Sequence, residues 1–453
     1  MADLMQIGVA SEVITPPLGS QMAGFDARKG ISDGVHDDLH ARTLVFESGE
    51  TRIALVSIEV IAVSADFSRR VRSCIEASTG IPASQILLSA THTHCGPVTL
   101  HHFFNQGQPL NEEYLEHMAH AITSAVETAW RSRKPRQLRT GLAPCEGIAV
   151  NRRTSDGAPV DSFAGVLLVE ECDGAAVAIA VNYACHTTVL GPNTLKITQD
   201  FPFFTLERLR QQMGAGVEAM YFNGAEGDLS VGHKSDLSAV GVVDSFRTFA
   251  TAQRLGERLA DSVLLSLPNL SLQPASLQAL VAEVNLPLKT YPSVEAMSAV
   301  REQALRDLEG IEPPAADQPV GPEFLKAKQK YLFARIEEYY ARLYAEVSCP
   351  DPKQLPVEVI VLRIGNLGIV SLPGEIFVQF ALNVRARSPL QQTLFFGLTN
   401  DYIGYLPDKK ADPLAGYEVI AARVPGEAMQ VLEAAIDTML KEVASVSAHG
   451  VCR

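Results

Sequence analysis

The sequence lacks the features that mark nucleic-acid-binding and membrane-spanning proteins. Among its 453 residues, 38 lysines and arginines are outnumbered by 52 aspartates and glutamates, giving a net charge of −14, and no run of basic residues forms a positive patch. We therefore do not expect nucleic acid as a partner, because phosphate backbones bind to basic surfaces. The apolar stretches near 175–181 and 356–371 are too short for a transmembrane segment or are interrupted by Arg363 and Asn366.

Signs of export are also absent. The seven cysteines form no CxxC pair and no dense framework, and their odd number leaves at least one thiol unpaired. The N-terminus carries Asp3 early and has no basic segment followed by a long apolar stretch, unlike a secretory signal. We therefore predict a cytoplasmic protein with reduced thiols. A secreted protein cloned without its signal would have the same N-terminus.

Patterns typical of strands and helices alternate along most of the chain. Strands are predicted over 42–47, 52–59, 85–90, 137–144, 164–170, 175–183, 219–222, 280–288, 356–363, 368–372 and 393–398. Helices are predicted over 65–79, 111–133, 250–266, 374–387 and 425–445, and directly after Asp200. This alternation indicates the α/β fold class, with one large mixed α/β domain over residues 1–453.

One segment departs from this alternation. Residues 293–346 are charged and helical, with a proline-containing interruption at 311–319. The pattern predicts a helical hairpin inserted into the domain. Such a hairpin is either a lid over a site or an ordinary packed pair of helices, and the sequence leaves both interpretations open.

The strongest local sign of chemistry follows the strand predicted over 85–90, where the chain reads Thr91-His92-Thr93-His94-Cys95-Gly96-Pro97. Side chains two residues apart on a strand face the same side, so we expect His92 and His94 to project together. In α/β sheets, ligands usually bind at the carboxyl ends of strands. Paired histidines of the core or the surface would also explain this pattern.

A metal ion needs more ligands, and the ends of other apolar strands offer them. His186 follows the strand predicted over 175–183, and Glu375 lies at the start of a predicted helix. An acid in the first turn of a helix also complements the helix dipole, which is an alternative role for Glu375. Tyr402 and Tyr405 follow the strand predicted over 393–398 and, taken alone, are typical packing residues.

Two loops carry further candidates. The glycine-rich segment 221–232 has the flexibility that brings backbone close to a ligand. It is not a nucleophile elbow, because Asp228 stands where GxSxG requires glycine, and it lacks the ending of a P-loop. Arg152 lies in a second loop, where an arginine is either a surface residue or a partner for a carboxylate or oxyanion. His36 and His40, near Asp37, form a weaker cluster.

Taken in order, the motifs resemble the neutral, non-lysosomal ceramidases, and in particular a short bacterial-type member without the C-terminal immunoglobulin-like domain. The matching segments are Ile7–Pro16, Met22–Phe25, Gly34–Arg42, His92–Pro97, Asn151–Arg152, Gly227–Ser230 and Leu372–Glu375. In that family a zinc-ligand tyrosine is followed after twelve residues by a catalytic Tyr-Glu pair. Tyr405 and Tyr417-Glu418 have this spacing.

The resemblance implies one Zn²⁺ ion per chain in a catalytic ligand set. The ligands that it implies are His92, His186, Glu375 and Tyr405. It implies that His94 transfers protons, and that Ser230 lies beside the scissile group. It also implies that Arg152 and Tyr417 hold the substrate or the developing oxyanion.

The resemblance further implies a zinc-dependent amidohydrolase that cleaves the N-acyl bond of a linear, lipid-like amide. Cys95, Glu226 and Val231 depart from the family motifs, so ceramide itself is not implied. An esterase or lactonase on the same site, or a non-catalytic binding module, are the alternatives. A second metal, with Glu59, Glu226 or Asp228 as ligands, is not expected, and a homo-oligomer is left open.

Overall fold

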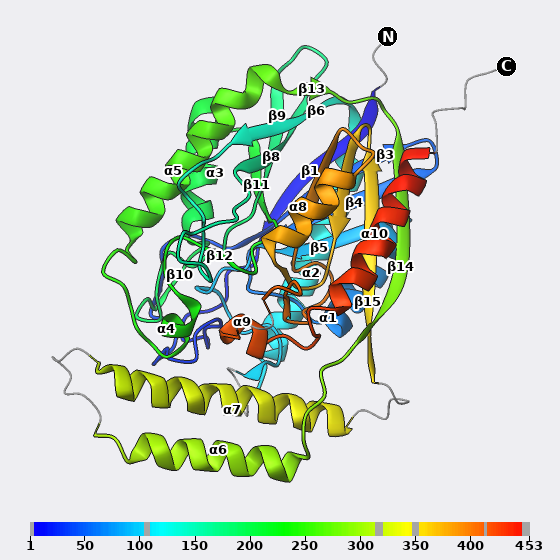
Figure 1. Ribbon diagram of the computed structural model, residues 1–453. Coiled ribbons are helices and arrows are strands. Elements are labelled where there is room, and N and C mark those ends of the chain that lie inside the picture. Colours follow the sequence, from blue (N-terminus) through cyan, green and yellow to red (C-terminus); the bar gives the residue numbers. More distant parts are fainter. Residues whose placement is uncertain (1–3, 104–108, 313–319, 347–352, 412–414, 446–453) are drawn as a thin grey trace.

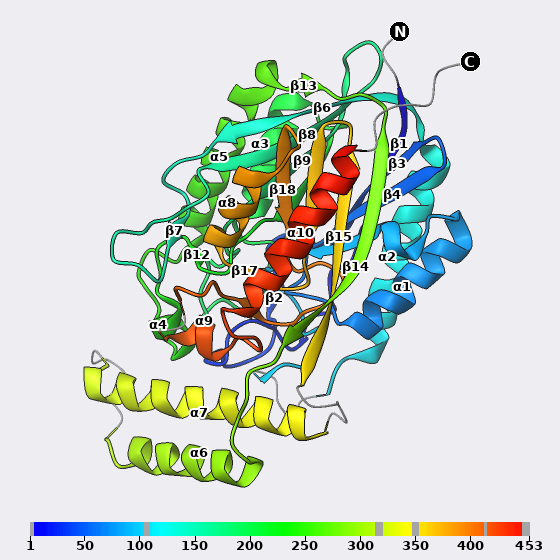
Figure 2. The ribbon, with the colours of Figure 1, turned by 45° about the vertical axis from the view of Figure 1, so that its right-hand side comes forward.

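The computed structural model describes residues 4–103, 109–312, 320–346, 353–411 and 415–445. In this part of the chain, helices and strands form two stacked β-sheets that lie between helical layers (Figures 1 and 2). The predicted α/β fold class is confirmed. None of the helices in the described ranges has the length and apolar character needed to cross a bilayer.

The larger sheet contains nine strands in the described residues, in the order β11-β9-β8-β6-β1-β3-β4-β5, with β13 beside β6. Their bounds are β1 Met5–Val13, β3 His40–Ser48, β4 Thr51–Ile58, β5 Ile86–Ala90, β6 Lys134–Pro144, β8 Phe163–Glu170, β9 Ala176–Tyr183, β11 Glu218–Asn223 and β13 Ser271–Leu272. Most pairs are antiparallel, but β4 pairs with β5 and β9 pairs with β11 in parallel. Strands buried on both faces are continuous apolar runs, as Ile53–Val56 of β4 shows.

The smaller sheet packs against one face of the larger sheet. It has the order β14-β15-β16-β18, with bounds β14 Leu277–Pro287, β15 Gln354–Ile364, β16 Leu367–Ser371 and β18 Gln392–Phe396. Leu55 and Phe222 of the larger sheet share one buried cluster with Ile360 and Phe396 of the smaller sheet. The rings of Phe222 and Phe396 stack with centroids 4.4 Å apart. The main core therefore lies between the two sheets.

Helices cover the outer face of each sheet (Figures 1 and 2). On the larger sheet, α1 and α2 cover one half and α3 and α5 cover the other half. On the smaller sheet, α8 and α10 form the outer layer. The bounds are α1 Ala65–Thr79, α2 Glu112–Ser132, α3 Phe201–Met213, α5 Phe249–Ser266, α8 Val378–Arg387 and α10 Ala428–Ser445.

The predicted helical hairpin is a pair of packed helices, α6 Val294–Glu309 and α7 Pro322–Glu346. The pair lies across one end of the molecule, below the short helices α4 Ser235–Ala239 and α9 Tyr417–Ile420 (Figure 1). Helix α7 faces the body: Ile336 and Tyr340 lie in the same buried cluster as Tyr405 and Tyr417. The hydroxyl of Tyr340 donates a hydrogen bond to the carbonyl of Ala421 at 2.7 Å.

The structure differs from the sequence-based expectations of local structure in three places. Strand β1 was not predicted, although it lies between β3 and β6 in the larger sheet. The strand before the two histidines ends at Ala90, as predicted, but His92 and His94 lie in the loop that follows, so strand alternation does not apply to them. Glu375 does not begin a helix, because it pairs in the short strand β17 Glu375–Ile376, and α8 begins at Val378.

Candidate metal centre and pocket

The three candidate metal ligands lie in segments that follow the carboxyl ends of strands. His92 follows β5, His186 follows β9, and Glu375 follows β16. All three residues are at most 2% exposed. This is the end of an α/β sheet where ligands are expected. The structure therefore brings together residues that are far apart in the sequence.

The ligand atoms of these residues converge on one point. His186 Nε2 lies 2.8 Å from Glu375 Oε2, and His92 Nε2 lies 3.6 Å from the same oxygen. The three ligand atoms all lie within 4.8 Å of one another. In the described residues, His92, His186 and Glu375 form the one cluster of histidines, cysteines and acids with metal-binding spacing.

Backbone carbonyls fix the orientation of both imidazoles. His92 Nδ1 lies 2.8 Å from the carbonyl of Ile61, and His186 Nδ1 lies 2.8 Å from the carbonyl of Glu226. A carbonyl only accepts, so each Nδ1 carries the proton and each Nε2 keeps its lone pair. Burial lowers the pKa of both histidines, that of His186 to about 4. Both shifts favour the neutral imidazole, the form that binds a metal ion.

Glu375 is held in place from two directions. Strand β17 pairs with β19 Tyr405–Leu406, with Glu375 opposite Tyr405, and the hydroxyl of Tyr402 donates to Glu375 Oε1 at 2.7 Å. Burial alone would raise the pKa of Glu375, but His92, His186 and Tyr402 outweigh it and hold the pKa at about 2. The side chain is a carboxylate that keeps Oε2 directed toward the histidines. Tyr402, taken from the sequence as a packing residue, is thus part of the site.

His94 adjoins the cluster. Its Nε2 lies 3.2 Å from His92 Nε2, and its Nδ1 has no hydrogen-bond partner in the described residues. The backbone, not strand alternation, creates this proximity, because His92 has φ of 68°. Burial lowers the pKa of His94 well below its ordinary value. A neutral imidazole beside the ligands is suited to proton transfer.

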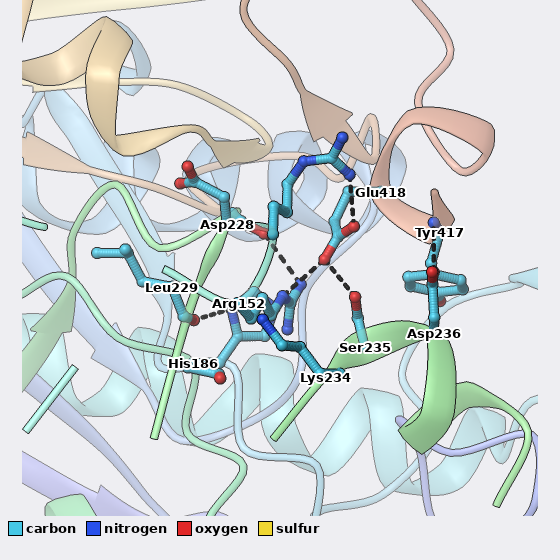
Figure 3. A network of polar contacts seen from close by, with 12 residues as sticks. Arg152, His186, Asp228, Leu229, Lys234, Ser235, Asp236, Tyr417 and Glu418 are labelled. Atoms are coloured by element: carbon cyan, nitrogen blue, oxygen red, sulfur yellow. Dashed lines mark hydrogen bonds and ion pairs between the residues drawn. The ribbon is translucent and has the colours of Figure 1, made fainter. Parts of the chain in front are cut away.

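Arg152 belongs to a buried polar network that includes Glu418 and Ser235 (Figure 3). Its Nε donates to Glu418 Oε1 at 2.7 Å, and its Nη2 donates to the hydroxyl of Tyr405 at 3.1 Å. Glu418 also binds Arg153 at 2.8 Å. Burial opposes the charged state, but Tyr405 and Glu418 raise the pKa of Arg152 above its ordinary value. The sequence suggested no role for Glu418 beyond its place in the Tyr-Glu pair.

The motifs Asn151–Arg152 and Gly227–Ser230 lie side by side in the structure. The short strands β7 Val150–Asn151 and β12 Leu229–Ser230 pair, and Asn151 Nδ2 donates to Asp228 Oδ2 at 2.6 Å. The other oxygen of Asp228 accepts the backbone N–H of Val378 at 2.8 Å, at the start of α8. A Cβ on Gly227 would lie 2.5 Å from the carbonyl of Glu375. These residues therefore anchor the backbone around Glu375.

The remaining predicted residues divide between the pocket and the structure behind it. Tyr405 and Tyr417 line the pocket, with ring centroids 5.9 Å apart. Ser230 is fully buried, and its hydroxyl donates to the carbonyl of His233 at 2.8 Å. Neither Ser230 nor Arg152 is among the lining residues.

The pocket in front of the cluster has a cavity volume of about 140 Å³. Its floor includes His92, His94 and Glu375, and one side consists of residues from the segment 21–30, which we call the N-terminal wall. Gly24 permits this close approach: it has φ of 97°, and a Cβ there would lie 2.4 Å from His94 Cγ. The sequence marked Met22–Phe25 only as a motif, without a role.

The residues considered for a second metal have other surroundings. Glu59 accepts hydrogen bonds from Arg42 Nε at 2.8 Å and from the backbone of His40 at 2.5 Å. Both carboxylate oxygens of Glu226 are buried and have no hydrogen-bond partner in the described ranges. Burial, and secondly Glu375, raise the pKa of Glu226 well above its ordinary value, which favours the neutral form of its carboxyl group. In the weaker cluster, His36 pairs with Asp37 at 2.7 Å.

Comparisons with known proteins agree with these motifs. Residues 5–156 match the family described as neutral/alkaline non-lysosomal ceramidase, N-terminal. The crystal structure of neutral ceramidase from Pseudomonas aeruginosa is similar, with a TM-score of 0.74 and 16% identity over 97% of this chain and 74% of that chain. A ceramidase complexed with C2 gives 0.73 and 17% identity over 99% and 77%. No curated protein matches the chain in sequence. The predicted resemblance to this family is confirmed.

Proposed function

Because the chain resembles the neutral/alkaline non-lysosomal ceramidases in sequence and fold, we propose that it is a zinc-dependent amidohydrolase that cleaves an N-acyl bond. The observation that carries the proposal is the convergence of His92 Nε2, His186 Nε2 and Glu375 Oε2 within 4.8 Å. Two imidazoles and one carboxylate are a ligand set of catalytic zinc sites, which keep a further position open. Tyr405, opposite Glu375 in the β17–β19 pair, is the proposed fourth ligand.

The donor set fits zinc for two reasons. Each histidine carries its proton on Nδ1, where a carbonyl accepts it, so both Nε2 lone pairs are directed toward Glu375. The Tyr402 hydroxyl satisfies Glu375 Oε1 and leaves Oε2 for a metal ion. Such outer contacts are typical of metal sites, where they set ligand orientation and basicity.

The pocket residues have complementary roles in this proposal. Zinc, when bound, supplies the Lewis acid that polarises a carbonyl and lowers the pKa of water. His94, which lines the pocket next to His92, protonates the leaving amine. Tyr417, which also lines the pocket, donates to the developing oxyanion. Arg152 acts from behind, as the positioning residue of Tyr405.

Elemental analysis of protein purified without added zinc tests the proposal. We expect about one zinc per chain, the content of a single catalytic site. His92→Ala and Glu375→Ala should lose the metal and the hydrolysis of N-acyl amides together. His36→Ala, which changes the weaker histidine cluster, is the matched control and should keep both.

Two results would contradict the proposal. Full metal retention in the inactive His92→Ala variant would remove that residue from the ligand set. Protein that holds no metal and takes up none on titration would favour a non-catalytic binding module. A substrate series of amides, esters and lactones with the same acyl chain then separates the amidohydrolase from an esterase or lactonase on the same site.

A further inference from the structure

The N-terminal wall presents an arginine without a carboxylate partner to the pocket. Arg28 lines the pocket, and its Nη2 donates to the carbonyl of His94 at 2.8 Å and contacts Cys95 Sγ at 3.8 Å. Its Nη1 donates to the carbonyl of Ala23. Its Nε has no partner in the described residues, and none of their carboxylates forms an ion pair with Arg28. The guanidinium charge is therefore unbalanced.

A second arginine lies behind the first. Arg247 is 4% exposed and donates to the carbonyls of Thr188 and Leu190 and to the hydroxyl of Ser238. It also forms no ion pair with a carboxylate in the described ranges. The two guanidinium groups flank Phe25, with Arg28 at 4.9 Å and Arg247 at 5.3 Å from the ring centroid.

No acid forms an ion pair with Arg28 in the described residues. Burial lowers the pKa of Arg247, but Asp200 and Asp244 lie close enough to oppose that shift. Asp26 also lines the pocket, but it pairs with Arg335 of α7 at 3.1 Å. Burial raises the pKa of Cys95 to about 12, so its thiol is neutral. Burial lowers the pKa of Arg28, and the contacts that oppose this shift come from the neutral Cys95. The N-terminal wall thus holds a cation without an ion-pair partner among the described residues, in a chain of net charge −14.

Two other buried arginines are paired with carboxylates. Arg42 binds Glu59 at 2.8 Å, and Arg152 binds Glu418 at 2.7 Å. Arg247 does not line the pocket, and carbonyl and hydroxyl oxygens accept its hydrogen bonds. Arg28 faces the pocket and has no ion-pair partner in the described residues, so a ligand is the natural source of its counter-ion.

We propose that Arg28 binds a carboxylate on the amine side of the substrate, so that the substrate class is an N-acyl amino acid. The planar guanidinium matches a carboxylate better than it matches a neutral headgroup. The amine side follows from position, because Arg28 is hydrogen-bonded to the backbone of His94, the proposed proton donor to the leaving amine. The apolar lining residues Met22, Ile61 and Val98 are available for the acyl chain.

This inference rests on the proposed function for its chemical step. Hydrolysis adds one water across the acyl C–N bond. The acyl carbon receives the water oxygen and leaves as a carboxylate. The amine nitrogen takes the proton and leaves as an amino acid, which needs no other reactant.

The test compares N-octanoylglycine with N-octanoylglycinamide, which differ only in the charge near the amine. We expect the wild type to prefer the acid in kcat/KM by roughly tenfold to a hundredfold, the range of a charge-assisted hydrogen bond. In Arg28→Gln the ratio should fall to about one, and Arg28→Lys should keep part of it. Lys29→Gln is the matched control: it removes the neighbouring exposed cation and should keep the ratio.

Thermal stabilisation by the same two compounds, measured with and without zinc, separates failure of the inference from failure of the proposed function. Stabilisation by the acid alone that is lost in Arg28→Gln supports the carboxylate site even if neither compound is cleaved. Equal use and equal binding of both compounds by the wild type would overturn it. So would an equal loss on both compounds in folded Arg28→Gln, because that result indicates a structural role.

Discussion

The protein balances the charges of two arginines near the pocket in opposite ways. Arg152 lies on the side of the candidate metal ligands, which we call the metal side, and Arg28 lies in the N-terminal wall. On the metal side, Arg152 has Glu418 as its counter-ion, and its pKa is raised. In the N-terminal wall, Arg28 has only carbonyls and a neutral thiol, and burial lowers its pKa. The comparison indicates that Arg152 receives its counter-ion from the protein, whereas the proposed counter-ion of Arg28 belongs to the substrate.

The largest expected effect is on catalysis and concerns His94, which contacts both His92 on the metal side and Arg28 in the N-terminal wall. His94→Ala should lower kcat by roughly 10²- to 10⁴-fold, the contribution of a general acid–base group. Its zinc content should stay that of the wild type, because His94 lies beside the ligand set and not within it. Steady-state kinetics with elemental analysis measure both. His120→Ala on the exposed face of α2 is the control, and loss of zinc from His94→Ala would make His94 a ligand.

Substitution of Arg152 and of Arg28 should change the free energy of unfolding by different amounts. Arg152→Gln should lower the free energy of unfolding by about 3 kcal/mol, because it breaks a buried ion pair and leaves Glu418 with Arg153 alone as its cationic partner. Arg28→Gln removes an unpaired cation, so its change should stay within about 1 kcal/mol. Urea unfolding of the two variants and the wild type measures the difference. Equal destabilisation would show that the two sides do not differ.

A smaller effect should come from the contact that orients Glu375. Tyr402→Phe removes the hydroxyl that donates to Glu375 Oε1 and keeps the ring. Zinc affinity should fall roughly tenfold to a hundredfold, as for other outer-shell partners of metal ligands. Competition with a chelator measures this affinity. Unchanged affinity would mean that the β17–β19 pairing alone orients the carboxylate.

The sequence predicted most of the fold because hydrophobic period marks most strands and helices directly. It did not predict β1, a strand whose buried residues, such as Met5 and Ile7, do not form an uninterrupted apolar run. It placed His92 and Glu375 in regular elements, since neither a positive φ at His92 nor a two-residue strand leaves a periodic signal.

The ligand residues of the candidate site were accessible from the sequence for a different reason. His92, His186 and Glu375 follow apolar strands, and the family resemblance gave them a common role. The contacts around them were not accessible. The hydrogen bonds from His92 and His186 go to backbone carbonyls of Ile61 and Glu226, which no residue type reveals. The sequence also does not show that Asp26, two residues from Arg28, pairs with Arg335 of the distant helix α7 instead.

The smallest expected effect comes from a substitution in the helical hairpin of α6 and α7, which also carries Arg335, the partner of Asp26. Tyr340 of α7 donates to the carbonyl of Ala421, next to the segment that carries Tyr417. Tyr340→Phe keeps the packing and removes one hydrogen bond, so it should lower the free energy of unfolding by about 1 kcal/mol. If α6 and α7 are a fixed wall, KM and kcat should stay as in the wild type. If they act as a lid, a weaker closed state should raise KM, and substrate titration of the two proteins distinguishes these outcomes.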